Sequence, residues 1–125
     1  MEVIRTKETL DSLKKEKVFG ELEGMYEIPT GRREEIGKFL EKHEHLFPIL
    51  KEAEEQIASI FGENVKLCLE LRHDPEEGWN ELFIVIKSGC SAEEAIELES
   101  KLAEEWFLDK MKDTKGRLNI TEEPL

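Results

Sequence analysis

The residue types best suited to chemistry stand together in one short polar segment of this sequence. His73, Asp74, Glu76 and Glu77 fall within RHDPEEGWN, which separates two apolar runs. An imidazole next to carboxylates can bind a divalent metal ion or take part in general acid and base catalysis. One interpretation of the segment is therefore a metal site or an acid–base site, and with it a metal-dependent or acid–base enzyme.

The same segment also has the composition of a tight turn. Asp74 can accept hydrogen bonds from its own backbone, Pro75 restricts φ, and Gly78 closes the turn. A metal site needs several ligands that converge on one point, and this spacing provides them only loosely. We favour the turn, whose role is to set the register of the two strands beside it.

The remaining histidines, His43 and His45, are two residues apart. In an unbroken helix they point in nearly opposite directions, so they cannot bind one ion together. His43 falls on an apolar helical stripe and is expected in the core, whereas His45 is expected at the surface. The sequence contains no glycine-rich phosphate loop and no activated serine, and we expect no cofactor.

A second candidate surface is apolar. Phe83 and Val85 alternate along the second apolar run, and if Trp79 points to the same side, the three large apolar groups share one face of the sheet. They form a docking or dimer surface if they are exposed, and part of the core if the N-terminal region covers them. Both interpretations stay open at this point. The side chains that would supply the cover are Leu10, Leu13, Val18 and Phe19.

Size and charge limit the partners. The chain has 125 residues, the length of one domain, and a formal net charge of −12. An acidic surface repels phosphate backbones and anionic lipid, so we expect neither nucleic acid nor a membrane as a partner. Two cysteines and no signal-like N-terminal run indicate a reducing, cytoplasmic setting. The longest apolar run, Leu82 to Ile86, is far too short to cross a bilayer.

Helices and strands that must position these residues follow from the hydrophobic periodicity. Apolar residues recur with helical spacing over 33–61, and Pro48 requires a kink or a division of that helix. Residues 65–72 alternate as a strand with one buried face, while residues 80–87 are apolar on both faces and are expected at the centre of the sheet. Ser91 and Glu94 form a capping box that starts another helix.

The predicted fold is α+β, with a mainly antiparallel sheet packed against a long Pro-kinked helix (33–61) and a second helix (91–111). The three strands are expected at 65–72, 80–87 and 117–121. Residues 1–32 are expected to form an arm, or a weak short helix plus a loop. Residues 33–125 are expected to form a single domain.

A series of motifs runs through most of the chain. They are Leu67-x-Leu69, Asp74-Pro75-Glu76, Leu82-Phe83-Ile84-Val85-Ile86, Ala95, Leu102, Trp106 and Gly116-x-Leu118-x-Ile120. The series resembles a family of small prokaryotic α+β proteins with a strand, an Asp-Pro-Glu turn, an apolar strand and an acidic helix with tryptophan near its end. The likeness covers about residues 36–123, with Trp106-Phe107 where that family often has paired tryptophans. It implies the fold and carries over no catalytic residue; an accessory role in a two-gene system is a hypothesis that the likeness brings.

These patterns favour binding over catalysis. We expect a small acidic module that acts by binding protein, either as a homo-oligomer or as the accessory partner of a more basic protein. The rival hypothesis is the enzyme or metal-binding protein that uses His73 and the carboxylates of the turn. A third hypothesis is a small-ligand pocket under the kink at Pro48.

Overall fold

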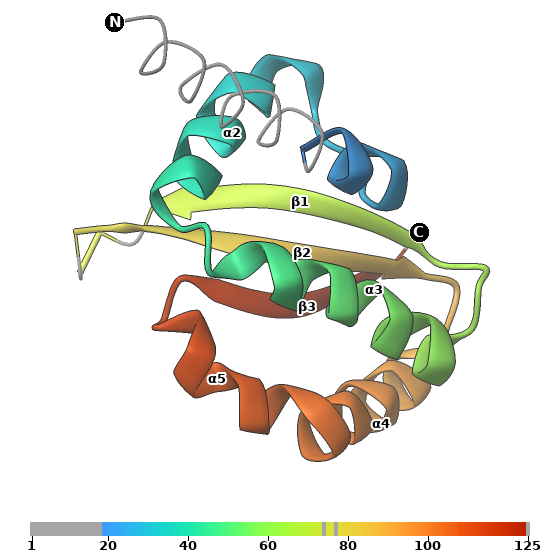
Figure 1. Ribbon diagram of the computed structural model, residues 1–125. Helices are drawn as coiled ribbons and strands as arrows, with labels where there is room; N and C mark the ends of the chain where they lie inside the picture. Colours follow the sequence, from blue (N-terminus) through green and yellow to red (C-terminus); the bar gives the residue numbers. More distant parts are fainter. Residues whose placement is uncertain (1–18, 74, 77, 125) are drawn as a thin grey trace, which may run out of the picture.

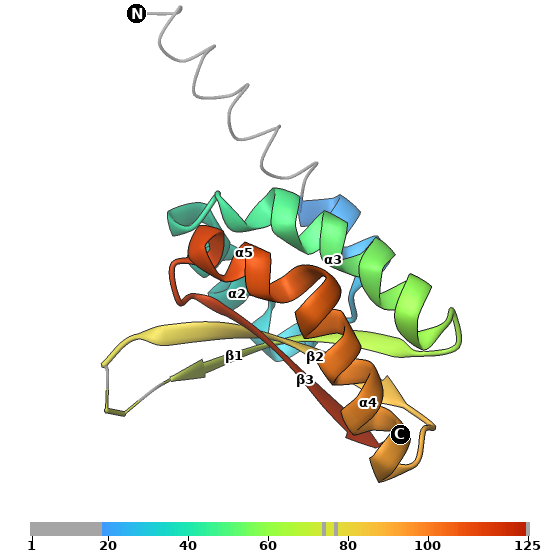
Figure 2. The same cartoon turned by 90° about the horizontal axis from the view of Figure 1, so that it is seen from below.

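The computed structural model describes residues 19–73, 75–76 and 78–124. It has an α+β fold of two layers, in which the helices lie against one face of a three-stranded sheet (Figures 1 and 2). The predicted fold class is confirmed. The elements are η1 (Thr30–Arg32), α2 (Arg33–Lys42), α3 (Leu46–Phe61), β1 (Lys66–His73), β2 (Asn80–Ser88), α4 (Ala92–Leu102), η2 (Ala103–Phe107), α5 (Leu108–Thr114) and β3 (Leu118–Pro124).

β2 is the central strand, as its two apolar faces predicted. β1 pairs with it in antiparallel register, with Leu69 opposite Ile84. β3 pairs with its other edge in parallel register, with Ile120 opposite Ile84. The sheet is therefore mixed, and the expectation of a mainly antiparallel sheet is corrected. The helical connection between β2 and β3 returns the chain to the end of the sheet where β2 begins, and a strand after such a crossover runs parallel to the first.

The long helix predicted over 33–61 is divided in two. A turn at residues 43–45 separates α2 from α3. Pro48 lies in the first turn of α3, where the N–H that proline lacks would have had no intrahelical acceptor. Gly62 ends α3 with a φ of 89°, which favours glycine, and its N–H donates to the Ala58 carbonyl at 3.0 Å.

The C-terminal helix, as we call residues 92–114, contains one π-helical turn. It starts at the predicted cap, where the Glu94 N–H donates to Ser91 Oγ at 3.2 Å. The π turn, η2, follows α4 and contains Trp106 and Phe107, both of which are buried. Neighbouring residues of a regular α-helix point about 100° apart. The wider turn allows two adjacent large side chains to face the same core.

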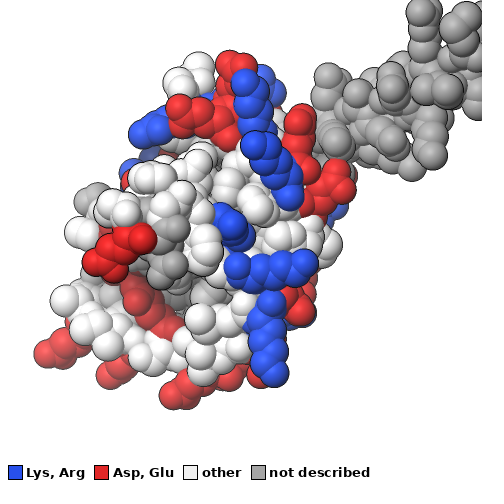
Figure 3. Space-filling model, turned by 90° about the vertical axis from the view of Figure 1, so that its left-hand side faces the viewer, with Lys and Arg blue, Asp and Glu red and all other residues white. Residues whose placement is uncertain are grey.

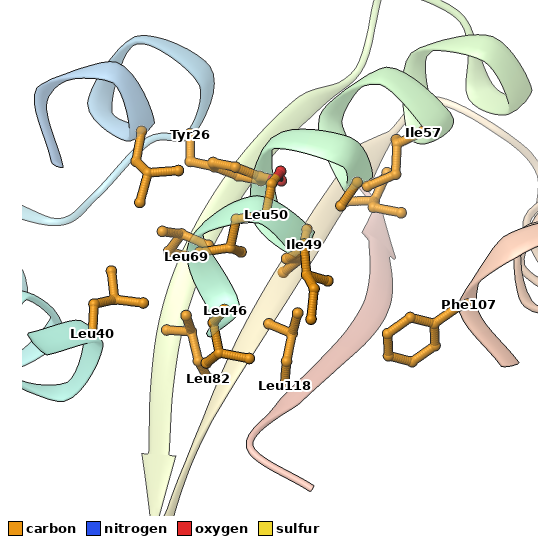
Figure 4. Close-up of a cluster of buried hydrophobic side chains, with 14 of the residues drawn as sticks. Tyr26, Leu40, Leu46, Ile49, Leu50, Ile57, Leu69, Leu82, Phe107 and Leu118 are labelled. Atoms are coloured by element: carbon orange, nitrogen blue, oxygen red, sulfur yellow. Dashed lines mark hydrogen bonds between the residues drawn. The ribbon is translucent and has the colours of Figure 1, made fainter. Parts of the chain in front are cut away.

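The core fills the space between the sheet and the helices (Figure 4). Alternate residues of β1 and β2 point into it, and Leu69, Leu82 and Ile84 are fully buried. The opposite side chains of the same strands lie on the open face of the sheet, which no helix of the described residues covers (Figure 2). The helices contribute Leu40, Leu46, Ile49, Leu50, Ile57 and Phe107, and β3 contributes Leu118.

Residues 19–28 also contribute side chains to this core. Residues 19–25 are helical, within the range 1–32 that was expected to form an arm, or a weak short helix plus a loop. Leu22 and Tyr26 are buried, and the Tyr26 hydroxyl donates to the Leu50 carbonyl at 2.6 Å.

Just after this helix, Glu27 forms a single parallel bridge with Cys68, at the outer edge of β1. The weak helix expected before residue 18 lies outside the described residues. The division of the chain at residue 32 therefore stays a prediction.

Candidate functional site

The polar turn between β1 and β2 holds the first set of predicted site residues. His73 is the last residue of β1, and its Nδ1 lies 3.0 Å from Asn80 Oδ1 on the neighbouring strand. The amide oxygen can only accept, so Nδ1 is the donor of this bond. Asp74 and Glu77 lie outside the described residues. Within the described ranges, no group of three or more His, Cys, Asp or Glu side chains, Glu76 included, is placed to hold a metal ion.

Arginine side chains cover part of the apolar surface predicted at Trp79, Phe83 and Val85. Val85 is buried, Phe83 is half-buried and Trp79 is 38% exposed, so the three do not form one open apolar patch. The Arg72 guanidinium lies 4.3 Å from the Phe83 ring centroid, and that of Arg117 lies 4.5 Å from the Trp79 ring centroid. Such cation–π contacts are favourable because the negative face of an aromatic ring attracts a cation. Two arginines cover these aromatic rings.

Phe19, one of the four side chains that could have covered this surface, packs elsewhere. The Arg33 guanidinium lies 5.5 Å from the centroid of its ring, beside α2. Leu10, Leu13 and Val18 lie outside the described residues.

The two neighbouring histidines are closer than an unbroken helix would allow. His43 and His45 stand in the turn between α2 and α3, with ring centroids 5.8 Å apart. The expectation that they point in opposite directions assumed a continuous helix and is corrected. His45 is half-buried with its Nε2 3.3 Å from the Thr114 carbonyl. His43 is half-buried against Phe39, at 4.4 Å between ring centroids, and is not a core residue.

The C-terminal helix presents carboxylates together with exposed apolar side chains. It carries eight carboxylates and three lysines between residues 92 and 114. Three of the four large hydrophobic residues exposed in the described ranges lie on it: Ile96 (66%), Leu108 (56%) and Met111 (50%). We call these three, with the exposed carboxylates beside them, the acidic helix face. Those carboxylates belong to Glu93, Glu94, Glu97, Glu104, Glu105, Asp109 and Asp113.

A pocket of about 640 Å³ lies between α2 and the sheet, and its lining is mainly basic. The α2 side is lined by Arg32, Glu35, Lys38, Phe39, Lys42 and His43. The sheet side is lined by Leu71, His73, Asn80 and Arg117. Figure 3 shows Lys and Arg side chains in a row across this face, the left side of Figure 1. We call it the basic pocket.

The cations of the basic pocket differ in how far they are neutralised. Arg32 pairs with Glu35 at 2.8 Å, and Lys38 pairs with Glu34 at 3.4 Å. Lys42 and Arg117 have no ion pair with any carboxylate of the described residues.

The same two cations act on the His43 imidazole, which lines the pocket with them. Burial of His43 first, and then the charges of Arg117, His45 and Lys42, lower the pKa of His43. The pocket therefore has a positive field that its own lining does not cancel.

The basic pocket was not predicted, and it differs from the ligand pocket expected under Pro48, which does not line it. Its cations are scattered along the sequence, at residues 32, 38, 42 and 117, without a basic run. The spacing of Lys38 and Lys42 on one helix is the only local signal. The fourth cation reaches the pocket because β3 begins beside β2.

Comparisons with protein-family models, with curated proteins and with solved structures found no match to this chain. The likeness to a family of small prokaryotic proteins therefore stays a prediction. No helix of the described residues is long and apolar enough to span a membrane.

Proposed function

We propose that this protein is a non-catalytic interaction module that binds a more basic protein through the acidic helix face. The observation that carries the proposal is the exposure of Ile96, Leu108 and Met111 among carboxylates on one helix. Exposed apolar side chains rimmed by charge are typical of protein docking surfaces. The apolar groups supply the contact area that leaves water, and the carboxylates select the sign of the partner's charge.

Charge complementarity favours a basic partner over a second copy of this chain. A two-fold dimer places the same patch of both subunits against each other. Here it would bring together two C-terminal helices, each with eight carboxylates and three lysines, at a cost from like-charge repulsion. A cationic amphipathic surface gains from the same charges, and the field of a chain with a net charge of −12 speeds its approach.

Site-specific photo-crosslinking tests where a partner binds. A photoreactive amino acid replaces Met111 in one variant and Asn119 in another, since both positions are exposed but Asn119 lies on the open face of the sheet. The two variants are expressed in the native host. We expect a basic protein to be captured at position 111 and not at position 119. Capture of an acidic protein, equal capture at both positions, or capture of a second copy of this chain would contradict the proposal.

Binding of the purified partner then tests the chemistry. Leu108→Ser with Met111→Ser should weaken the affinity about tenfold or more, mainly through faster dissociation. Glu104→Gln with Glu105→Gln should slow association, and the loss should shrink in high salt. Glu41→Gln with Glu63→Gln removes the same charge from exposed positions on other elements and is the matched control. If the control slows association as much as Glu104→Gln with Glu105→Gln, the general charge of the molecule and not the acidic helix face attracts the partner.

A further inference from the structure

The basic pocket stands out because the protein as a whole is strongly acidic. Its lining has four cations and a single carboxylate, on a chain with a formal net charge of −12. Long-range attraction of an anion by the whole protein is therefore excluded, and any anion must be held by the local field. From this local excess of positive charge we infer that the basic pocket binds a small organic anion with a phosphate or carboxylate group.

We place the anionic group at the two cations of the pocket that have no carboxylate partner among the described residues. Lys42 from the end of α2 and Arg117 from the residue before β3 line the same pocket as His43, and neither cation is paired with a carboxylate of the described residues. The Arg117 guanidinium is held by two contacts. It lies against the Trp79 ring at 4.5 Å, and its Nη1 donates to the Asn80 carbonyl at 3.3 Å. A positioned guanidinium and a lysine form strong charge-assisted hydrogen bonds with phosphate or carboxylate oxygens.

The rest of the pocket fits an organic body and not a bare ion. A volume of about 640 Å³ is in the usual range for sites of small organic ligands. Phe39 and Leu71 provide an apolar wall. His73 and Asn80, which are paired with each other at the turn-side ends of β1 and β2, provide polar groups. The His73 side chain is already oriented by its bond to Asn80 at 3.0 Å. Inorganic phosphate alone would leave most of this wall in contact with water.

This inference is independent of the proposed function. The basic pocket belongs to α2, the turn-side ends of β1 and β2, and Arg117, whereas the acidic helix face belongs to the C-terminal helix. Substitutions at one surface leave the other intact, so each can fail without the other.

Calorimetric titration of the purified chain with defined probes tests the inference. The probes are adenosine monophosphate, citrate, inorganic phosphate and uncharged adenosine. We expect one of the two organic anions to bind at least about tenfold more tightly than inorganic phosphate and than adenosine. The phosphate monoester and the tricarboxylate separate the two possible anionic groups. If neither organic anion binds, or if inorganic phosphate binds as well as they do, the inference is overturned.

Charge-neutralising variants locate the site. Lys42→Gln and Arg117→Gln should each weaken binding about tenfold. Lys66→Gln with Lys101→Gln removes two exposed lysines outside the pocket and should leave binding unchanged. Lys42 is exposed and makes no structural ion pair within the described residues, so its substitution keeps the test valid even if Arg117→Gln disturbs Trp79. Wild-type affinity in Lys42→Gln, or an equal loss in the control, would contradict the assignment.

Two further ligands separate small molecules from polymers. An octapeptide of glutamates and a single-stranded oligonucleotide carry the same anionic groups on a chain. We expect both to bind more weakly than the better small organic anion, because the apolar wall lies inside the pocket. Tighter binding of the peptide or of the oligonucleotide would replace the small anion by an acidic protein segment or by nucleic acid.

Discussion

At the scale of single residues, His43 reports the field inside the basic pocket. It is bordered by Phe39 and Lys42 of α2, by His45 in the turn and by Arg117 before β3. Burial and the nearby positive charges lower the pKa of His43 from its ordinary value of 6.5. Lys42 is next to His43 in the sequence, whereas Arg117 joins it only through the fold. A sequence pattern that places His43 on a helical stripe cannot show this.

An NMR titration of the His43 ring protons should therefore give a pKa below 6.5. Lys42→Gln should raise the pKa, because one of the charges that oppose protonation is removed. Sulfate, which keeps its charge over this pH range, should raise it as well if it enters the pocket. By linkage, the affinity for sulfate should then increase as the pH falls through the pKa of His43. Lys101→Gln is the control, and a shift as large as that of Lys42→Gln would show that the pKa follows the overall charge of the protein.

The lowered pKa of His43 also affects the pH dependence of folding stability. Because the pKa of His43 is lower in the folded chain, the unfolded chain binds the proton more tightly. The free energy of unfolding should therefore fall as the pH drops below about 6.5, through this residue. In His43→Gln, that part of the pH dependence should be absent from urea unfolding curves.

At the scale of elements, the Glu52 carboxylate of α3 binds two side chains of the C-terminal helix at the edge of the core. Trp106 Nε1 donates to Glu52 Oε1 at 2.6 Å, and Lys110 Nζ lies 3.2 Å from Glu52 Oε2. The bond from Trp106 and the contact with Lys110 lower the pKa of Glu52. The unfolded chain then binds the proton more tightly, so this stabilisation is present at neutral pH and is lost as the pH falls below about 4.5.

Glu52→Gln should lower the free energy of unfolding by about 1 kcal/mol at neutral pH, a value reduced by the partial exposure of Glu52. The difference from wild type should disappear in acid, where the carboxylate of the wild-type chain is itself neutral. Glu55→Gln removes an exposed carboxylate from the same helix and should change stability little at either pH. Urea unfolding at both pH values measures these differences. A loss for Glu52→Gln that persists unchanged in acid would mean that the charge of Glu52 does not stabilise the helix pair.

The elements also show what periodicity can predict. The alternation of Leu69 with its neighbours and the two apolar faces of β2 correctly indicated the strands and their order, because burial imposes a period of two. The cap at Ser91 and the division near Pro48 were predicted because each depends on local backbone chemistry. The parallel pairing of β3 was missed because it depends on the crossover and not on the strand itself. The basic pocket was missed for the same reason, since its walls come from segments far apart in the sequence.

At the scale of the whole molecule, charge is unevenly distributed. The acidic helix face carries most of the carboxylates of the C-terminal helix, while the basic pocket collects cations from η1, from α2 and from Arg117. Two copies could therefore attract each other only head to tail, with the acidic helix of one at the basic pocket of the next. Such an association is not closed by a two-fold axis and would grow with concentration.

We expect the purified protein to be a monomer, because a pocket of about 640 Å³ admits a small molecule and not the side of a helix. Sedimentation equilibrium over a range of concentrations, at low and at physiological salt, measures this. A mass that grows with concentration at low salt, and returns to that of one chain in Lys42→Gln with Arg117→Gln, would identify the acidic helix of a second copy as the occupant of the pocket. Lys66→Gln with Lys101→Gln serves as the control, since it changes the net charge equally. Growth that is abolished by Leu108→Ser with Met111→Ser alone would instead indicate apolar self-association through the acidic helix face, and the proposed basic partner would lose its binding surface.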